Sequence, residues 1–350
     1  MKYFYYDDLG NIYLSKFEAL RKTVSPSLYF YDKQFSAANW SVEPSLSLEQ
    51  LYKNRAQQIR DKYKYVILAY SGGIDSTTIL ETFYYNNIHI NEIVVVGALS
   101  QDDHEGSDAN HNGELYHNVF PTLNSLDLAR TKITVVDYTK DFASNKTLPL
   151  LNNLELKYKT LDEWFSPHNW WWASLETRFH YSQSCIVFGI DKPIYNIDNA
   201  SQGYFEFNSS SINQYGHTAC DQSNSLTREF FYWSPDMPEI LIKQLYIVDN
   251  FYRLGVKLGK LTKQSFLENQ NEIVSKLVYP KPRNKLKFLS PKSPSSILSL
   301  RDQYLVKAKS SEIYKDYVKY LEWLKANKLA TLDGHSPVGP YITSKKYYLK

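Results

Sequence analysis

The stretch from Tyr65 to Leu80, YVILAYSGGIDSTTIL, decides the fold of this chain. Residues 65–70 form a short apolar run with β-branched members, which is typical of a strand buried on both faces. Two glycines follow, and from Ile74 onward apolar residues recur at helical spacing. The sequence therefore predicts a buried strand, a glycine turn and a helix, with the turn at the carboxyl end of the strand.

This turn contains the residue types that bind phosphate. Gly72 and Gly73 let the backbone adopt positive φ and approach a ligand closely. The unpaired N–H groups at the start of the helix, together with its dipole, attract an anion. Hydroxyl donors surround the glycines, namely Ser71, Ser76 and Thr77. Asp75 would repel phosphate unless a cation lay between them, so its carboxylate predicts a bridging Mg²⁺.

The six residues Ser71 to Ser76, SGGIDS, resemble the SGGxDS loop of the N-type ATP pyrophosphatases, which include asparagine, GMP, NAD and lysidine synthetases. The resemblance implies an α/β fold of the HUP type (adenine nucleotide alpha hydrolase-like), with a doubly wound, mostly parallel sheet. It implies ATP and Mg²⁺ as cofactors, with ATP cleaved between the α and β phosphates and AMP attached to a substrate oxygen. The loop from Ser71 to Thr77, which includes Ile74, would hold the departing pyrophosphate. The alternative is a turn that only connects a strand to a helix.

A second strand is expected to reach the same site. NEIVVVGALS at 91–100 reads as the next parallel strand, so its carboxyl end would lie beside the loop at a switch point of the sheet. In the resembled family the backbone at this strand end contacts adenine. The resemblance gives that role to Gly97, Ala98 and Leu99.

A third strand, Cys185 to Phe188, ends in Gly189, Ile190, Asp191 and Lys192. This run is similar to the glycine and acid motif that faces the pyrophosphate loop in asparagine synthetase-like enzymes. Those enzymes usually carry a longer GDGxDE-type run, whereas here a lysine follows the single aspartate. Asp191 would be a second Mg²⁺ ligand beside Asp75, and Lys192 would neutralise phosphate charge as the leaving bond breaks. The alternative is a surface turn with an incidental charge pair.

Length and composition limit the classes of protein to which this chain can belong. The 350 residues suit one large domain or two smaller ones, and a net charge of +3 does not dictate a nucleic-acid partner. No apolar run approaches the ~20 residues of a membrane span, and the start MKYFYYDDLGN lacks the regions of a signal peptide. We therefore expect a cytoplasmic protein without a membrane partner. Two cysteines, Cys185 and Cys220, are too few for a four-cysteine zinc site.

Two further segments carry charge without a clear motif. His111, Glu114 and His117 are spaced three apart and could share a helical face, but HxxExxH is not the HExxH pattern of zinc hydrolases, and a solvated loop before a capped helix explains the same residues. The lysine-rich stretch 257–292 could hold an RNA backbone, close over the active site, or form a solvated surface. The 30 tyrosines could stack on bases, although aromatic residues usually fill cores.

Three regions are expected along the chain. Residues 1–60 form an N-terminal β/α extension, 61–200 the ATP pyrophosphatase domain, and 201–350 a mainly helical acceptor-substrate region with a basic loop. The further elements predicted are short strands on either side of a turn at 8–11, a strand at 27–35, helices at 47–63, 115–129 and 312–324, a strand at 132–138, a hairpin within 193–215, and a long helix that Pro235 and Pro238 open.

The chain as a whole resembles a stand-alone asparagine synthetase-like protein, which implies an AMP-forming ligase. A substrate carboxylate would be adenylated and then converted to an amide by ammonia or an amine. Position 2 is Lys2 rather than the nucleophilic cysteine of a glutaminase domain, so ammonia would come from solution or a separate protein. One alternative is adenylation of a nucleic-acid base, as in lysidine synthetase or the tRNA thiolases, with Cys185 on the site strand. Another is a catalytically idle nucleotide-binding protein.

Overall fold

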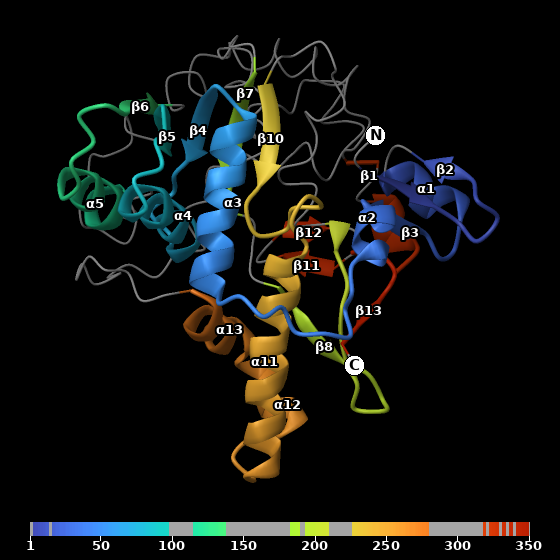
Figure 1. Cartoon of the computed structure of the whole chain (residues 1–350). Helices are drawn as coiled ribbons and strands as arrows, with labels where there is room; N and C mark the ends of the chain where they lie inside the picture. Colours follow the sequence, from blue (N-terminus) through green and yellow to red (C-terminus); the bar gives the residue numbers. More distant parts are fainter. Residues whose placement is uncertain are drawn as a thin grey trace.

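A central parallel sheet organises the part of the chain that the computed structural model describes (Figure 1). The described residues are 3–13, 16–97, 115–137, 183–189, 193–209, 226–279, 318–319, 322–328, 331–333, 336–338 and 341–349. The five strands of the sheet are β4 (Tyr65–Ala69), β5 (Glu92–Gly97), β6 (Lys132–Asp137), β7 (Ser184–Phe188) and β10 (Leu226–Phe230).

The order of these strands is β10-β7-β4-β5-β6, and every neighbouring pair is parallel. From β4 the chain proceeds to β5 and β6 on one side, and β7 and β10 then lie on the other side. The direction of winding therefore reverses between β4 and β7, and ligands of open α/β sheets bind at such a switch point. The predicted doubly wound, parallel α/β fold is confirmed.

Both faces of the sheet are buried, as an uninterrupted apolar strand requires. Val66 and Leu68 belong to the large core shared with α3 (Leu48–Lys62), α4 (Ile74–Tyr85) and α5 (Phe120–Asn124). Ile67 and Ala69 point to the opposite face, where they join a second buried group. The alternation follows from the two-residue period of a strand.

The predicted helix before β4 is α3, and a capping box fixes its start. Ser47 accepts a hydrogen bond from the Gln50 N–H at 3.2 Å, and the Gln50 side chain accepts one from the Ser47 N–H at 2.9 Å. The apolar side of the helix packs on the sheet, and its buried Arg55 pairs with Glu229 of β10 at 2.7 Å. This ion pair ties α3 to the edge strand of the sheet.

The N-terminal segment confirms the predicted turn but not the full length of the predicted strands. β1 (Tyr3–Tyr6) lies between β2 (Ile12–Tyr13) and β3 (Ser27–Phe30), and both pairings are antiparallel. The strand predicted over 27–35 is wrong beyond Phe30, because Tyr31 adopts the left-handed conformation at φ 49° and α2 (Asp32–Ala37) begins. Helix α1 (Lys16–Lys22) likewise replaces the end of the predicted second strand.

The helix predicted over 115–129 is confirmed only as far as Asn124, and the predicted hairpin is present. The helical part begins with a π-helix, η2 (Leu115–Val119), and continues as α5, and residues 125–129 are not helical. β8 (Tyr195–Ile197) and β9 (Gly203–Phe205) form the antiparallel hairpin. Near the C-terminal end, β13 (Tyr347–Tyr348) joins β9 from the other side, a pairing that the sequence did not predict.

The C-terminal region contains helices and strands. Pro238 precedes α11 (Glu239–Lys257), which is followed by α12 (Lys263–Glu268) and α13 (Gln270–Val278). β11 (Thr331–Asp333) and β12 (Ser336–Val338) form a small antiparallel pair. Of the helix predicted over 312–324, residues 318–319 and 322–324 are described, and they are helical. β10 also falls in this region, so the central sheet extends beyond residue 200.

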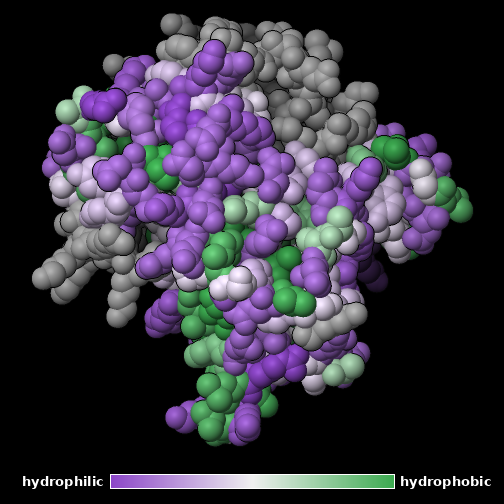
Figure 2. Space-filling model, viewed as in Figure 1, coloured by the Kyte–Doolittle hydropathy of each residue, from purple (hydrophilic) through white to green (hydrophobic). Residues whose placement is uncertain are grey.

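The face seen in Figure 2 carries apolar side chains at the tip that α11 and α12 form, among other places. Leu254 and Leu258 expose 57% and 56% of their surface there. None of the described helices combines the length and the apolar character needed to cross a membrane.

Candidate functional site

The SGGIDS loop lies where the sequence predicted it, between the end of β4 and the start of α4. Gly72 has a φ of +76°, in the left-handed region that favours glycine. A Cβ added there would also come within 2.6 Å of the Val119 Cγ2 atom, so the loop packs directly against η2. Gly72 is therefore required twice, once by its conformation and once by its contact.

Gly73 differs from the expectation of positive φ at both glycines. It has a φ of −71° and occupies the position immediately before the first turn of α4. Among the described residues, an added Cβ there would meet only the Ser71 Oγ atom, at 3.5 Å. The described part of the chain therefore leaves room for a ligand beside this backbone, close to the amino end of the helix.

The three hydroxyl groups of the loop have different surroundings. Ser76 is buried, and its hydroxyl donates to the Gly73 carbonyl at 3.2 Å while accepting from the Ser71 N–H at 3.3 Å. Thr77 is buried as well, with its Oγ1 atom 3.2 Å from the Tyr70 hydroxyl. Ser71 is exposed, so its hydroxyl is the one of the three that solvent and ligands reach most directly.

Asp75 lies in the first turn of α4, where a carboxylate interacts favourably with the helix dipole. Its carbonyl accepts a hydrogen bond from the Tyr232 hydroxyl at 2.7 Å. Gly189, just after β7, lies close to Asp75, since an added Cβ at Gly189 would be 3.3 Å from the Asp75 Cβ atom. Gly189 therefore lets β7 and α4 approach each other at the switch point.

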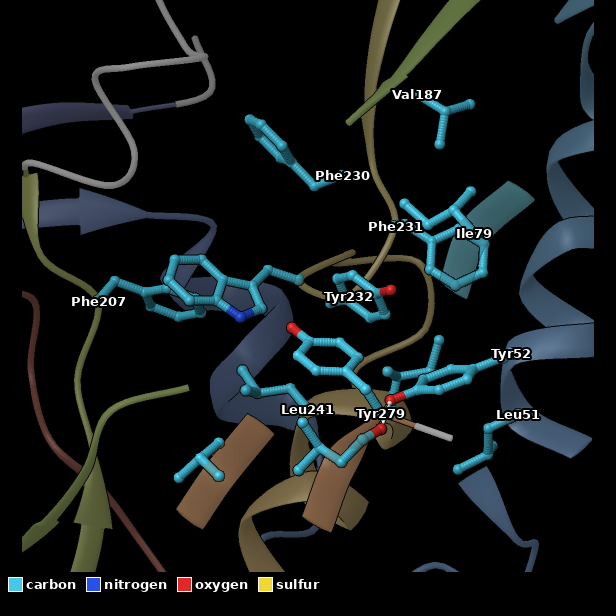
Figure 3. Close-up of a cluster of buried hydrophobic side chains, with 14 of the residues drawn as sticks. Leu51, Tyr52, Ile79, Val187, Phe207, Phe230, Phe231, Tyr232, Leu241 and Tyr279 are labelled. Carbon is cyan, nitrogen blue, oxygen red and sulfur yellow. Dashed lines mark hydrogen bonds between the residues drawn. The ribbon is translucent and has the colours of Figure 1, made fainter. Parts of the chain in front are cut away.

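Three buried tyrosines, Tyr52, Tyr232 and Tyr279, pack together (Figure 3), and the Tyr232 hydroxyl reaches the Asp75 carbonyl. The Tyr232 ring lies 5.5 Å from the Tyr52 ring and 5.4 Å from the Tyr279 ring, and both contacts are edge-to-face. Burial raises the pKa of all three hydroxyls, and the negative charge of Asp75 raises each of them further. The tyrosines therefore remain protonated near neutral pH and face the carboxylate as neutral groups.

Hydrogen bonds to neighbouring helices fix this cluster. The Tyr52 hydroxyl donates to the Val278 carbonyl at 2.7 Å, next to Tyr279 in the chain. Gln244 of α11 donates to the Tyr52 hydroxyl at 2.9 Å. Sequence reasoning missed these tyrosines, since burial of aromatics is expected anyway and no motif shows where their hydroxyl groups point.

The other predicted site residues are only partly described. Gly97 is the last residue of β5 and pairs with Asp137 of β6, which places it at the carboxyl edge of the sheet as expected. Ala98, Leu99, Asp191 and Lys192 lie outside the described residues. Of the predicted residues after β7, the structure thus describes Gly189 but not Asp191 or Lys192.

The described residues fit a magnesium ion that phosphate oxygens also bind. No group of three His, Cys, Asp or Glu side chains occurs among them, which argues against a metal cage built from described side chains alone. Mg²⁺ usually takes one or two carboxylates together with water and phosphate oxygens. Asp75, at the amino end of α4, supplies one such carboxylate.

Cys185 is part of the core rather than of an accessible site. It lies within β7, fully buried, between Val66 and Thr227 of the neighbouring strands. Burial raises the pKa of its thiol, and the charge of Glu229 raises it further. Because the thiolate is the nucleophile, this position does not suit Cys185 for the thiolation chemistry that the sequence left open.

Comparison with known proteins gives little further information. No protein-family model and no curated protein matches this sequence. One solved structure similar to it is the NH3-dependent NAD synthetase from Campylobacter jejuni subsp. jejuni NCTC 11168, with a TM-score of 0.28 and 11% identity, covering 81% of this chain and 97% of that one. Another is the NAD+ synthetase from Burkholderia pseudomallei, with a TM-score of 0.28 and 12% identity, covering 85% of this chain and 95% of that one. At these TM-scores neither likeness supports a conclusion about the activity of this chain.

Proposed function

We propose that this protein is an ATP-dependent, AMP-forming ligase that adenylates a substrate carboxylate and then forms an amide with ammonia or an amine. The observation that carries the proposal is the SGGIDS loop itself. It follows the central strand β4, precedes α4, and lies at the switch point of a parallel sheet. Sequence motif and position in the fold thus agree on an anion-binding role.

The residues of the chain would act mainly by binding and orientation. The first N–H groups of α4 and the Ser71 hydroxyl would bind the β and γ phosphates, with Gly72 and Gly73 allowing close approach. A carboxylate oxygen of the substrate would attack the α phosphorus, and the bond to pyrophosphate would break. Ammonia would then attack the acyl carbon, releasing AMP and a proton. No protein nucleophile is required, so positioning supplies most of the acceleration.

Asp75 would hold magnesium together with Asp191, a residue outside the described part of the chain. The ion would supply charge neutralisation for the phosphate oxygens. Lys192 would bring a further positive charge to the same group. The roles of Gly97, Ala98 and Leu99 at the adenine are part of the same proposal.

Product identification tests the proposal. Purified protein with ATP, MgCl2, ammonia and a panel of carboxylates that includes aspartate should release AMP and pyrophosphate. The carboxylate that raises the rate identifies the substrate class. Asp75→Ala should abolish the release, whereas Asp61→Ala, which removes an exposed carboxylate on α3, should not change it.

Other products would contradict the proposal. Release of ADP and phosphate would mean that the loop binds ATP for a different chemistry. Release of AMP only in the presence of RNA or DNA would instead indicate base modification. Nucleotide binding without cleavage under every condition would indicate an idle nucleotide-binding protein.

A further inference from the structure

We propose that Tyr232 is a positioning residue that holds Asp75 in place at the loop through a hydrogen bond to the Asp75 carbonyl, and that Tyr279 supports Tyr232 by packing against its ring. This inference deepens the proposed function and rests on it, because Asp75 matters as the magnesium-holding carboxylate. Neither tyrosine belongs to a motif recognisable in the sequence. Both come from the segment 226–279, far along the chain from the loop that they would control.

Tyr232 fixes the first turn of α4 to the sheet. It follows β10 by two residues, and the Phe231 N–H donates to the Phe188 carbonyl at 3.1 Å, so the chain leaving β10 remains attached to β7. The Tyr232 side chain is fully buried, and its hydroxyl donates to the Asp75 carbonyl at 2.7 Å. A hydroxyl group anchored on the sheet thus determines where the Asp75 backbone lies.

Tyr279 supports Tyr232 from the end of α13. The residue is 4% exposed, and its ring lies 5.4 Å from the Tyr232 ring in an edge-to-face contact (Figure 3). Burial raises the pKa of the Tyr279 hydroxyl, and the nearby charge of Asp75 raises it further, so this tyrosine stays neutral beside the loop. Tyr279 therefore acts on Asp75 through Tyr232.

Two further elements hold Tyr279 where it is. Tyr52 of α3 donates to the carbonyl of Val278, the residue before Tyr279, and Gln244 of α11 donates to Tyr52. By contrast, Ser71 and Ser76 form their hydrogen bonds within the loop, as far as the described residues are concerned. Asp75 is the loop residue that a hydrogen bond from the later part of the chain reaches.

The metal requirement for nucleotide binding tests this arrangement. We would titrate MgCl2 against the wild type and Tyr232→Phe at a fixed concentration of α,β-methylene-ATP, which binds without being cleaved between those phosphates. Loss of the hydrogen bond to the Asp75 carbonyl should raise the half-saturating Mg²⁺ concentration about 2- to 10-fold. The matched control is Tyr246→Phe, which removes a buried hydroxyl that donates to the Trp40 carbonyl at 3.0 Å.

The control separates positioning from general loss of structure. Tyr246→Phe should keep the Mg²⁺ dependence of the wild type, and the two variants should unfold at similar temperatures without ligand. If Tyr232→Phe also kept the wild-type Mg²⁺ dependence, the inference would be wrong. If it lost nucleotide binding only in proportion to its thermal stability, the inference would be wrong as well.

A second measurement needs neither ATP nor Mg²⁺. In a double-mutant cycle of Tyr232→Leu and Tyr279→Leu, which removes the edge-to-face pair, the unfolding equilibrium constants should be non-additive by at least about twofold. Additive effects would overturn the assigned support of Tyr232 by Tyr279. A wild-type chain that bound no nucleotide would overturn the proposed function instead, and the cycle would still decide whether Tyr232 and Tyr279 act together.

Discussion

Two independent features of the structure require a glycine at position 72. Its positive φ disfavours any side chain, and its α-carbon faces Val119 of η2 at a distance that leaves no room for a methyl group. Neither feature applies to Gly73 next to it, although the two residues look alike in the sequence. Substitutions at these neighbouring positions should therefore have very different effects.

Gly72→Ala should destabilise the fold by about 1 to 3 kcal/mol, the usual cost of a strained backbone conformation, and should also displace the loop. Gly73→Ala should change stability much less, because its φ of −71° suits any residue. Urea unfolding of both variants checks the first effect, and binding of α,β-methylene-ATP checks the displacement. Equal stability losses in the two variants would contradict this account.

The loop and its strand were predictable because their physics is local. A glycine pair between an apolar run and a helical pattern has few structural solutions, and β4, α4 and the capping box at Ser47 follow from such short-range signals. The hydroxyl of Tyr232 was not predictable in this way. Its partner lies 157 residues away in the sequence, so only the folded chain brings the two together.

The edge strand β10 is joined to α3 by a buried charge network. Glu229 accepts from Arg55 at 2.7 Å and from Lys62 at 3.0 Å, and the Tyr63 hydroxyl donates to it as well. Arg55 is fully buried, so its charge depends on this carboxylate for compensation. The sequence did not reveal β10, because LTREF lacks the continuous apolar run that is typical of a strand buried on both faces.

Glu229→Gln should lower the free energy of unfolding by about 3 kcal/mol, since it leaves a buried guanidinium without its counter-charge. Glu272→Gln is the matched control, because it removes the same group from the exposed pair with Lys276 and should leave stability nearly unchanged. Urea unfolding at pH 7 measures both changes. A similar loss in the two variants would show that the buried pair has no special role.

The same network predicts how stability depends on pH. Burial by itself raises the pKa of Glu229, but Arg55, the Tyr63 hydroxyl and Lys62 outweigh it and hold the pKa below its usual value of 4.5. Because the folded-state pKa is lower than the unfolded-state pKa, the contribution is present above the unfolded value and is lost as pH falls through the folded one. Between about pH 5 and pH 3, wild-type stability should fall more steeply than that of Glu229→Gln. Equal slopes in a series of urea unfolding curves would contradict this assignment.

At the scale of the whole molecule, segments that are distant in sequence pack against each other. The Leu28 N–H of β3 donates to the Thr343 carbonyl at 2.9 Å, and β13 pairs with β9. Phe35 and Phe207 pack on Tyr347, in a core that residues from both ends of the chain build. The sequence predicted the central sheet but not this closure, because short aromatic strands carry no signal that specifies a remote partner.

Ile342→Ala should therefore cost about 2 to 4 kcal/mol of unfolding free energy, as expected for a buried aliphatic side chain. Ile342 is 3% exposed, whereas its neighbour Tyr341 is 55% exposed, so Tyr341→Ala is the control and should have little effect. Chemical denaturation of the two variants makes the comparison. If Ile342→Ala were as stable as Tyr341→Ala, the C-terminal segment would not be part of the core.

This closure also sets the order of events during synthesis. The Phe207 N–H donates to the Ser344 hydroxyl, 137 positions later in the chain. At a translation rate of about 5 to 20 residues per second, Phe207 waits roughly 7 to 30 seconds for that partner. During this interval the aromatic side chains of the β8–β9 hairpin are without their final cover, so we expect the nascent chain to be a client of chaperones that bind exposed aromatic segments.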